Sequence, residues 1–188
     1  MNQKLQLRFG ILTAIVLVAA LSRFLPHPPN FTPIGGIALF GAAYFHKRSW
    51  AFLVPFLALL ASDMILNFVL IPSQFPQFDP ASSWRASAWN YPAFALIVLL
   101  GFVLRRQLSA GRLLMTSFSA SLLFFLVTNF GVWLNSTFYG QHPGGLLSAY
   151  VAGIPFFWNT LAGDLLYSAL LFGSFEWISR RFPVLQAK

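Results

Sequence analysis

Long runs of apolar residues, broken by short clusters of charged or turn-forming residues, make up most of this chain. Six apolar segments stand out, with the approximate bounds Leu7–Leu25, Thr32–Phe45, Trp50–Ile71, Tyr91–Leu104, Leu113–Leu134 and Ala149–Ile178. A transmembrane helix needs about 20 apolar residues. The second and fourth segments have 14 residues each and are therefore marginal by length alone. The pattern predicts an all-α membrane protein built as a bundle of six transmembrane helices.

The distribution of basic residues supports this count. If the N-terminus is cytoplasmic, the inner connections and termini hold Lys4, Arg8, Lys47, Arg48, Arg105, Arg106, Arg112, Arg180, Arg181 and Lys188. The outer connections then hold only Arg23 and Arg85. Lys and Arg are concentrated in cytoplasmic loops, so this asymmetry predicts that both termini are cytoplasmic and that the short second segment also crosses.

Composition excludes several other classes of protein. Hydrophobic residues make up 57% of the chain and charged residues only 9%, whereas a soluble domain has about 25% charged residues. Six spans leave room for short loops only, so residues 1–188 are predicted to form a single transmembrane domain. The net charge of +8 is spread over the ends of apolar runs, which does not indicate binding to nucleic acid. The chain has no cysteine, and its histidines lack metal-ligand spacing, so we predict no metal site and no cofactor.

The most informative residue is Asp164, an aspartate near the middle of the last apolar segment. On a helix it shares one face with Gly163, Tyr167 and Ser168, while leucines occupy the opposite face. A carboxylate at the centre of a bilayer costs at least about 2.5 kcal/mol, so it should face the bundle interior. Asp63 lies inside the third segment in the same way, with Asn67 one turn later on the same face. Either aspartate can serve function or can only hold helices together.

Other polar and aromatic residues are predicted to surround a binding site at the outer face, where the connections are longest. The inner wall would comprise Asp63, Asn67, Asn129, Trp158, Asn159, Asp164 and Tyr167, and the covering loops would contribute His27, Trp84 and Trp89. Small-molecule sites combine such apolar surfaces with a few polar groups. Any single tryptophan can instead be an anchor at the membrane interface. Glu176 and Arg180, four residues apart near the end of the last segment, are read as an ordinary surface pair.

Two stretches carry a resemblance to a known family. They are SRFLPHPPNFTPIGGIALF at residues 22–40 and PFFWNTLAGDLLYSALLFG at residues 155–173. With them, nearly the whole chain resembles an uncharacterised bacterial inner-membrane family described as transport proteins. That family looks related to the substrate-binding S-components of energy-coupling factor (ECF) vitamin transporters.

The resemblance implies a fold, a location and a mode of action. S-components are six-helix proteins of about this size with cytoplasmic termini, and they bind a vitamin under the outer loops after helices one, three and five. They dock on a transmembrane energising partner through small residues of the first helix, and Gly10 and Ala14 offer a comparable pair here. Some solitary S-components use a cysteine as a cobalt ligand, which this chain lacks.

The expected function is therefore uptake of a small vitamin-like, aromatic or heterocyclic nutrient from the outer face of the bacterial inner membrane. No GxxxxGK[ST] phosphate-binding loop is present, so energy would come from a partner, or transport would be facilitated. The chain is not expected to be an enzyme. One alternative is a non-transporting structural subunit of a membrane complex, which predicts a collapsed outer face. A more remote alternative is an intramembrane aspartyl protease using Asp63 and Asp164, although the usual GxGD motif is replaced by ASD and AGD.

Overall fold

Helices account for nearly all of the computed structural model, which describes residues 3–186 except for the side chains of residues 82 and 86. No strand occurs in this part of the chain. The helices are α1 (Gln3–Leu21), α2 (Ile34–Tyr44), α3 (Arg48–Ile65), α4 (Ile71–Gln74), α5 (Pro80–Ser87), α6 (Asn90–Gly101), α7 (Ala110–Asn135) and α8 (Pro143–Arg181). Short 3₁₀ turns at Ser22–Phe24, Phe102–Arg105 and Pro183–Gln186 extend α1, α6 and α8, and a π-helical turn at Leu66–Leu70 joins α3 to α4.

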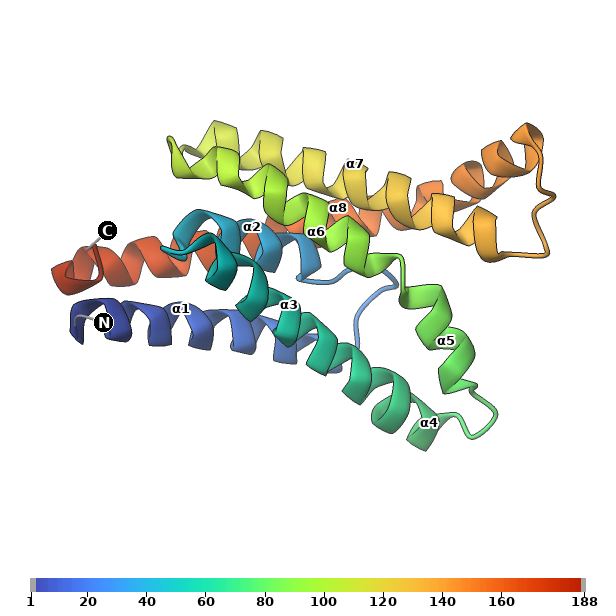
Figure 1. Ribbon diagram of the computed structural model, residues 1–188, viewed down its shortest axis with the longest axis horizontal. Coiled ribbons are helices and arrows are strands. Elements are labelled where there is room, and N and C mark those ends of the chain that lie inside the picture. The colour runs from blue at the N-terminus through green and yellow to red at the C-terminus, as the bar shows by residue number, and fades with distance from the viewer. Residues whose placement is uncertain (1–2, 187–188) are drawn as a thin grey trace.

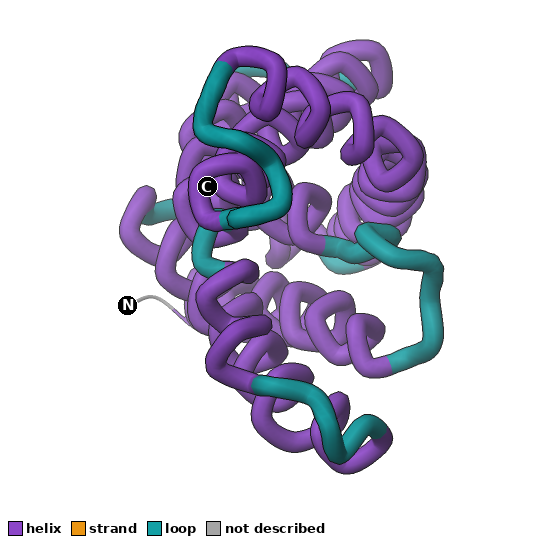
Figure 2. The backbone as a smooth tube through the Cα atoms, turned by 90° about the vertical axis from the view of Figure 1, so that its right-hand side faces the viewer, coloured by secondary structure: helices purple, strands orange, loops and turns teal. Residues whose placement is uncertain are grey.

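The long helices lie side by side along one axis and alternate in direction, so that both chain ends lie at the same end of the bundle (Figure 1). Figure 2 shows the same bundle along its long axis, from the end at which α4 and α5 lie. We refer to the end that holds the N- and C-termini as the terminal end and to the other as the distal end. The common position of the termini is what an even number of passes requires.

Four stretches are long and apolar enough to cross a membrane: Gln3–Phe24, Arg48–Gln74, Ser83–Arg105 and Ala110–Asn135. The prediction of a membrane protein is thus supported, while the prediction of six spans is supported for four segments only. Helix α2 has 11 residues, and at 1.5 Å per residue it is about 16 Å long, against about 30 Å of hydrocarbon. Helix α8 has 39 residues but carries more polar groups than the other long helices.

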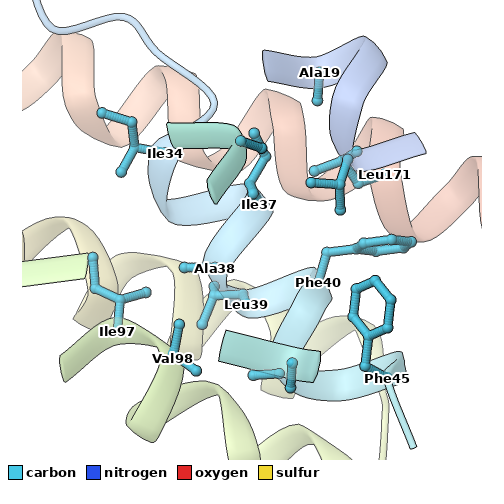
Figure 3. Packing of buried hydrophobic residues seen from close by; sticks show 14 of the residues in the cluster. Ala19, Ile34, Ile37, Ala38, Leu39, Phe40, Phe45, Ile97, Val98 and Leu171 are labelled. Atoms are coloured by element: carbon cyan, nitrogen blue, oxygen red, sulfur yellow. The ribbon is translucent and has the colours of Figure 1, made fainter. Parts of the chain in front are cut away.

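Helix α2 is the centre of the hydrophobic core. Every residue from Ile34 to Ala42 is buried, and the helix contacts α1, α3, α6, α7 and α8. Its side chains pack in several directions, with Ile97 and Val98 of α6 on one side and Leu171 of α8 on another (Figure 3). A helix that is apolar all round is typical of such a buried position. The prediction that the second apolar segment is a helix is therefore correct, but its apolar side chains pack in the hydrophobic core of the protein.

Two helical features were absent from the sequence prediction. Helix α5 lies within the stretch that was expected to be an outer loop. Helix α8 begins at Pro143, six residues before the predicted start at Ala149. His142 caps this earlier start because its side chain accepts a hydrogen bond from the amide of Gly145. Two glycines in the first turn hid this start, since glycine disfavours helix interiors.

Candidate functional site

The carboxylate of Asp63 forms a buried ion pair with Arg23. Arg23 Nη2 lies 2.5 Å from Asp63 Oδ1, and the two side chains are only 8% and 3% exposed. Arg23 Nη1 also donates to Ser62 Oγ, and Tyr91 donates to Asp63 Oδ2 at 3.0 Å. Both carboxylate oxygens are thus occupied. Arg23 was predicted to lie in an outer connection, and it does lie in the connection between α1 and α2. Its side chain is nevertheless buried against Asp63, where the two charges balance each other.

The π-helical turn that follows Asp63 holds Asn67 in the same region. Asn67 Nδ2 donates to the backbone oxygen of Asp63 at 2.9 Å, and Ser83 of α5 donates to Asn67 Oδ1 at 2.6 Å. The predicted proximity of Asp63 and Asn67 is observed, but the bond uses the backbone and not the carboxylate. The turn thereby connects α3 to α5, and single π-turns inside helices are frequent at functional sites.

Asp164 faces the bundle interior and binds the N-terminal end of α2. Its side chain is 2% exposed, Ser121 of α7 donates to Oδ2 at 2.7 Å, and the backbone amides of Gly35 and Gly36 donate to the carboxylate. The amide groups at a helix N-terminus carry partial positive charge and bind anions. Asp164 therefore acts as a cap for α2 supplied from a distant helix.

Glycine at position 35 leaves room for the Asp164 carboxylate to come close to the backbone of α2. A Cβ atom at that position would lie 2.5 Å from Asp164 Cγ, which is shorter than any real contact of this kind. At Gly36 a Cβ atom would lie 3.0 Å from the Cβ atom of Tyr167. The Gly35-Gly36 pair thus lets the backbone of α2 meet α8 directly, as expected for glycine at close backbone contacts.

Hydrogen bonds and an ion pair hold the connection between α1 and α2, residues 22–33, against the neighbouring helices. Ser22 Oγ lies 2.8 Å from the hydroxyl of Tyr167, and Asn159 Nδ2 donates to the carbonyl of Pro29 at 2.9 Å. Arg23 adds the ion pair to α3. This segment, which we call the cover, therefore bridges α3 and α8 at the distal end of the bundle. The proline-rich sequence suits the role because it cannot form a helix.

The remaining predicted site residues do not gather in one cavity. Trp84 contacts Phe68 and Tyr91, whereas Trp89 packs on Phe130. Asn129 donates to Phe125 of its own helix. These three side chains are partly buried at the distal half of the bundle.

Trp158 and His27 are the outermost members of the predicted site. Trp158 is 62% exposed on α8, which matches the alternative reading as an interfacial anchor. His27 is exposed in the cover, where its Nδ1 lies 2.9 Å from the carbonyl of Pro28. Within the described residues, no group of three His, Cys, Asp or Glu side chains is placed to hold a metal ion.

The two aspartates belong to separate hydrogen-bond clusters. Asp63 accepts from Arg23 and Tyr91, while Asp164 accepts from Ser121 and the α2 amides. Ser22 and Arg23 are adjacent in the chain: Arg23 belongs to the Asp63 cluster, whereas Ser22 contacts Tyr167, three residues after Asp164 in α8. An aspartyl protease requires two carboxylates that share a proton, and separate donor sets do not favour that arrangement.

A cleft that sequence reasoning missed lies at the terminal end. Its volume is about 780 Å³. Its walls come from α1, the ends of α2 and α6, the start of α3, and α8, and its lining includes Arg8, Tyr44, His46, Lys47, Trp50, Arg105, Arg106 and Glu176. Glu176 was expected to form a surface pair with Arg180, but its carboxylate instead accepts a 2.5 Å hydrogen bond from the hydroxyl of Tyr44. The clustering of basic residues in the predicted inner loops was the sequence feature that could have indicated this cleft.

Gly10 and Ala14, the predicted docking pair, lie on the outside of α1. Both residues are exposed, and nothing lies within 4 Å of a Cβ atom built on Gly10. They share this outer side of the helix with Leu17 and Leu21. The pair therefore does not serve packing within the bundle.

Comparison with known proteins identifies a family. The model of a family of unknown function, DUF6580, matches residues 3–185. This chain belongs to that family. No curated protein and no solved structure is significantly similar to the chain. Membership supports the expectation of an uncharacterised family, while the relationship to ECF S-components and the transport activity remain proposals.

Proposed function

We propose that this member of the DUF6580 family is a six-pass inner-membrane protein, similar in architecture to ECF S-components, that binds a small nutrient at its outer face for uptake. One observation carries the proposal: Asp63 and Asp164 are buried inside apolar helices, and Arg23 of the cover is buried against Asp63. Ionisable residues inside a membrane bundle mark substrate or ion pathways more often than they serve structure alone.

The short helix α2 strengthens this proposal. In secondary transporters, substrates often bind where a discontinuous helix ends at mid-membrane, because its N-terminal amides are free to bind anionic groups. Helix α2 has this form, and its N-terminal end meets Asp164 near the middle of α8. Asp164 would hold these amides in the ligand-free protein, and a polar group of the substrate would take part in the same network.

Entry of a substrate would require release of the cover. The Arg23–Asp63 pair and the Ser22–Tyr167 hydrogen bond hold the cover on α3 and α8, so both would break or rearrange on opening. Aromatic rings near Tyr91, namely Trp84 and Phe56, supply an apolar surface suited to a flat heterocycle. The proposed ligand is therefore a small aromatic or heterocyclic molecule with at least one hydrogen-bonding group.

Mass spectrometry of small molecules that remain bound to the protein in mild detergent tests the proposal. Wild type would be run beside Asp63→Asn and Asp164→Asn, each of which removes a charge at nearly constant volume. Ser119→Ala is a matched control, because this serine bonds only to its own helix on α7. We expect one compound that is retained by wild type and the control and is reduced at least tenfold in the other two variants.

The structural-subunit alternative has support of its own. Gly10 and Ala14 form an exposed small-residue pair on α1, and such pairs allow another helix to approach closely. The same purification distinguishes the uptake role from the structural-subunit role. If no compound is retained by wild type and a protein partner co-purifies, with its amount reduced by Gly10→Leu, the uptake proposal is wrong and the subunit alternative is favoured.

A further inference from the structure

The cleft at the terminal end is strongly cationic. Four cationic side chains, Arg8, Lys47, Arg105 and Arg106, line it together with one carboxylate, that of Glu176. Glu176 accepts a 2.5 Å hydrogen bond from the hydroxyl of Tyr44. The cleft thus carries a net excess of positive charge, and its electrostatic complement is an anion.

The cations fall into two groups. Arg105 donates to the carbonyls of Ala42 and Phe45 at 2.6 and 2.7 Å, and Arg8 donates to Tyr44 and Leu185. Both arginines are therefore fixed in place by the fold. Lys47 and Arg106 are exposed at the mouth of the cleft, where their side chains can reach a bound group.

Apolar side chains make up much of the remaining lining, next to the polar His46 and Gln107. The large apolar ones include Leu5, Phe9, Leu12, Trp50, Leu104 and Leu108. Phe9 and Trp50 stack edge to face with ring centroids 5.2 Å apart, and Trp50 and Leu108 are 39% and 37% exposed. A free inorganic anion gains no favourable contact from these apolar side chains, whereas a molecule with a charged head and a hydrocarbon tail can bind both the cationic and the apolar part of the cleft.

The position of the cleft further restricts the kind of molecule that it can bind. The cleft lies beside α1 and α3, both long and apolar enough to cross a membrane, and at the end that the positive-inside pattern makes cytoplasmic. Basic pockets between transmembrane helices on that side bind anionic lipid head groups. We propose that this cleft binds an anionic phospholipid of the inner leaflet, with its phosphate at Lys47 and Arg106 and an acyl chain along Phe9 and Trp50.

Reconstitution into nanodiscs of defined lipid tests this assignment. The thermal midpoint of unfolding would be compared in phosphatidylcholine alone and with phosphatidylglycerol added in steps. We expect phosphatidylglycerol to stabilise wild type in a saturable way. The double variant Lys47→Gln/Arg106→Gln should need roughly 25-fold more anionic lipid for the same effect, since each of the two cations near the surface contributes about a fivefold change in affinity.

A charge-matched control separates the cleft from general attraction to a negative surface. Arg85→Gln/Arg181→Gln removes two cations that do not line the cleft, and it should respond to phosphatidylglycerol like wild type. Equal loss of response in both double variants would overturn the proposal. So would equal stabilisation of wild type by inorganic phosphate in phosphatidylcholine nanodiscs, because the cleft would then be a site for a free anion.

Discussion

Arg23 and Asp63 show how a single long-range contact makes two buried charges tolerable. Removing charges from water is costly, and a buried pair offsets this cost only when its geometry is good and its other polar atoms are satisfied. Ser62 and Tyr91 supply the additional hydrogen bonds here. The pair also connects the cover to α3, so that one contact contributes to stability and holds the cover in position.

We expect Arg23→Met and Asp63→Asn each to destabilise the protein by about 3–5 kcal/mol, because each leaves an uncompensated buried group. The double variant should lose less than the sum of the single losses, since neither charge is then left alone. Unfolding in detergent, followed by helical circular dichroism, gives the coupling free energy. Additive losses would show that the two side chains do not interact as described.

The contact between Gly35 and Asp164 gives a second test at the scale of one residue. We expect Gly35→Ala to destabilise the protein by roughly 1–3 kcal/mol, because the added methyl group overlaps the carboxylate. Gly173→Ala is the matched control: nothing lies within 4 Å of its Cβ position, so it should be neutral or stabilising by up to about 1 kcal/mol. If both variants behaved alike in the same unfolding experiment, the close contact at Gly35 would be wrong.

Helix α2 has an anion at its start and a cation at its end. Asp164 binds the amides of its first turn, and Arg105 binds carbonyls at its last turn. Both charges complement the helix dipole and satisfy backbone groups that a helix leaves unpaired at its ends. A short helix that is buried on all sides is thus stabilised at both ends by residues from other helices.

Arg105→Lys should weaken the last turn of α2 although it keeps the charge. The planar guanidinium donates to three carbonyls, those of Ala42, Phe45 and His46, whereas a lysine ammonium cannot match this fixed fork. We expect a loss of roughly 1 kcal/mol and faster amide hydrogen exchange at residues 41–45. Unchanged exchange there, with intact exchange elsewhere in the core, would contradict the capping role.

At the scale of the whole molecule, the proposed six-pass arrangement depends on α2, which is too short to cross a bilayer alone. In this proposal its flanking segments complete the pass, and irregular backbone is tolerated at membrane depth when protein surrounds it. The end of the cover meets this condition, since a Cβ atom on Gly163 of α8 would lie 3.0 Å from the backbone of Thr32.

The absence of cysteine from the sequence makes this topology directly testable. Single variants His27→Cys and Ser49→Cys place a thiol at an exposed position before and after α2. With a membrane-impermeant maleimide applied to intact cells, we expect labelling at position 27 and not at position 49, and labelling of both after lysis. Labelling of both positions in intact cells would show that α2 does not carry the chain across.

Hydropathy and charge along the chain are enough to predict the class of the protein and most of its helices. Apolar segments of sufficient length and the scarcity of charge specify a helical membrane protein, because only helices or closed barrels satisfy the backbone in lipid. Helical periodicity also correctly predicted that Asp164 faces the bundle interior. These properties are local, since they depend on residues within a few turns of one another.

Which groups meet depends on the three-dimensional fold. Arg23 and Asp63 are separated by 40 residues, and nothing local to the loop containing Arg23 indicates that it folds inward. The same holds for the pairing of Asp164 with the α2 amides and for the cationic cleft, whose lining comes from both ends of the chain. Because burial of an unpaired charge is costly, Arg23 and Asp63 require each other and Asp164 requires hydrogen-bond donors, and such partners are brought together in three dimensions rather than along the sequence.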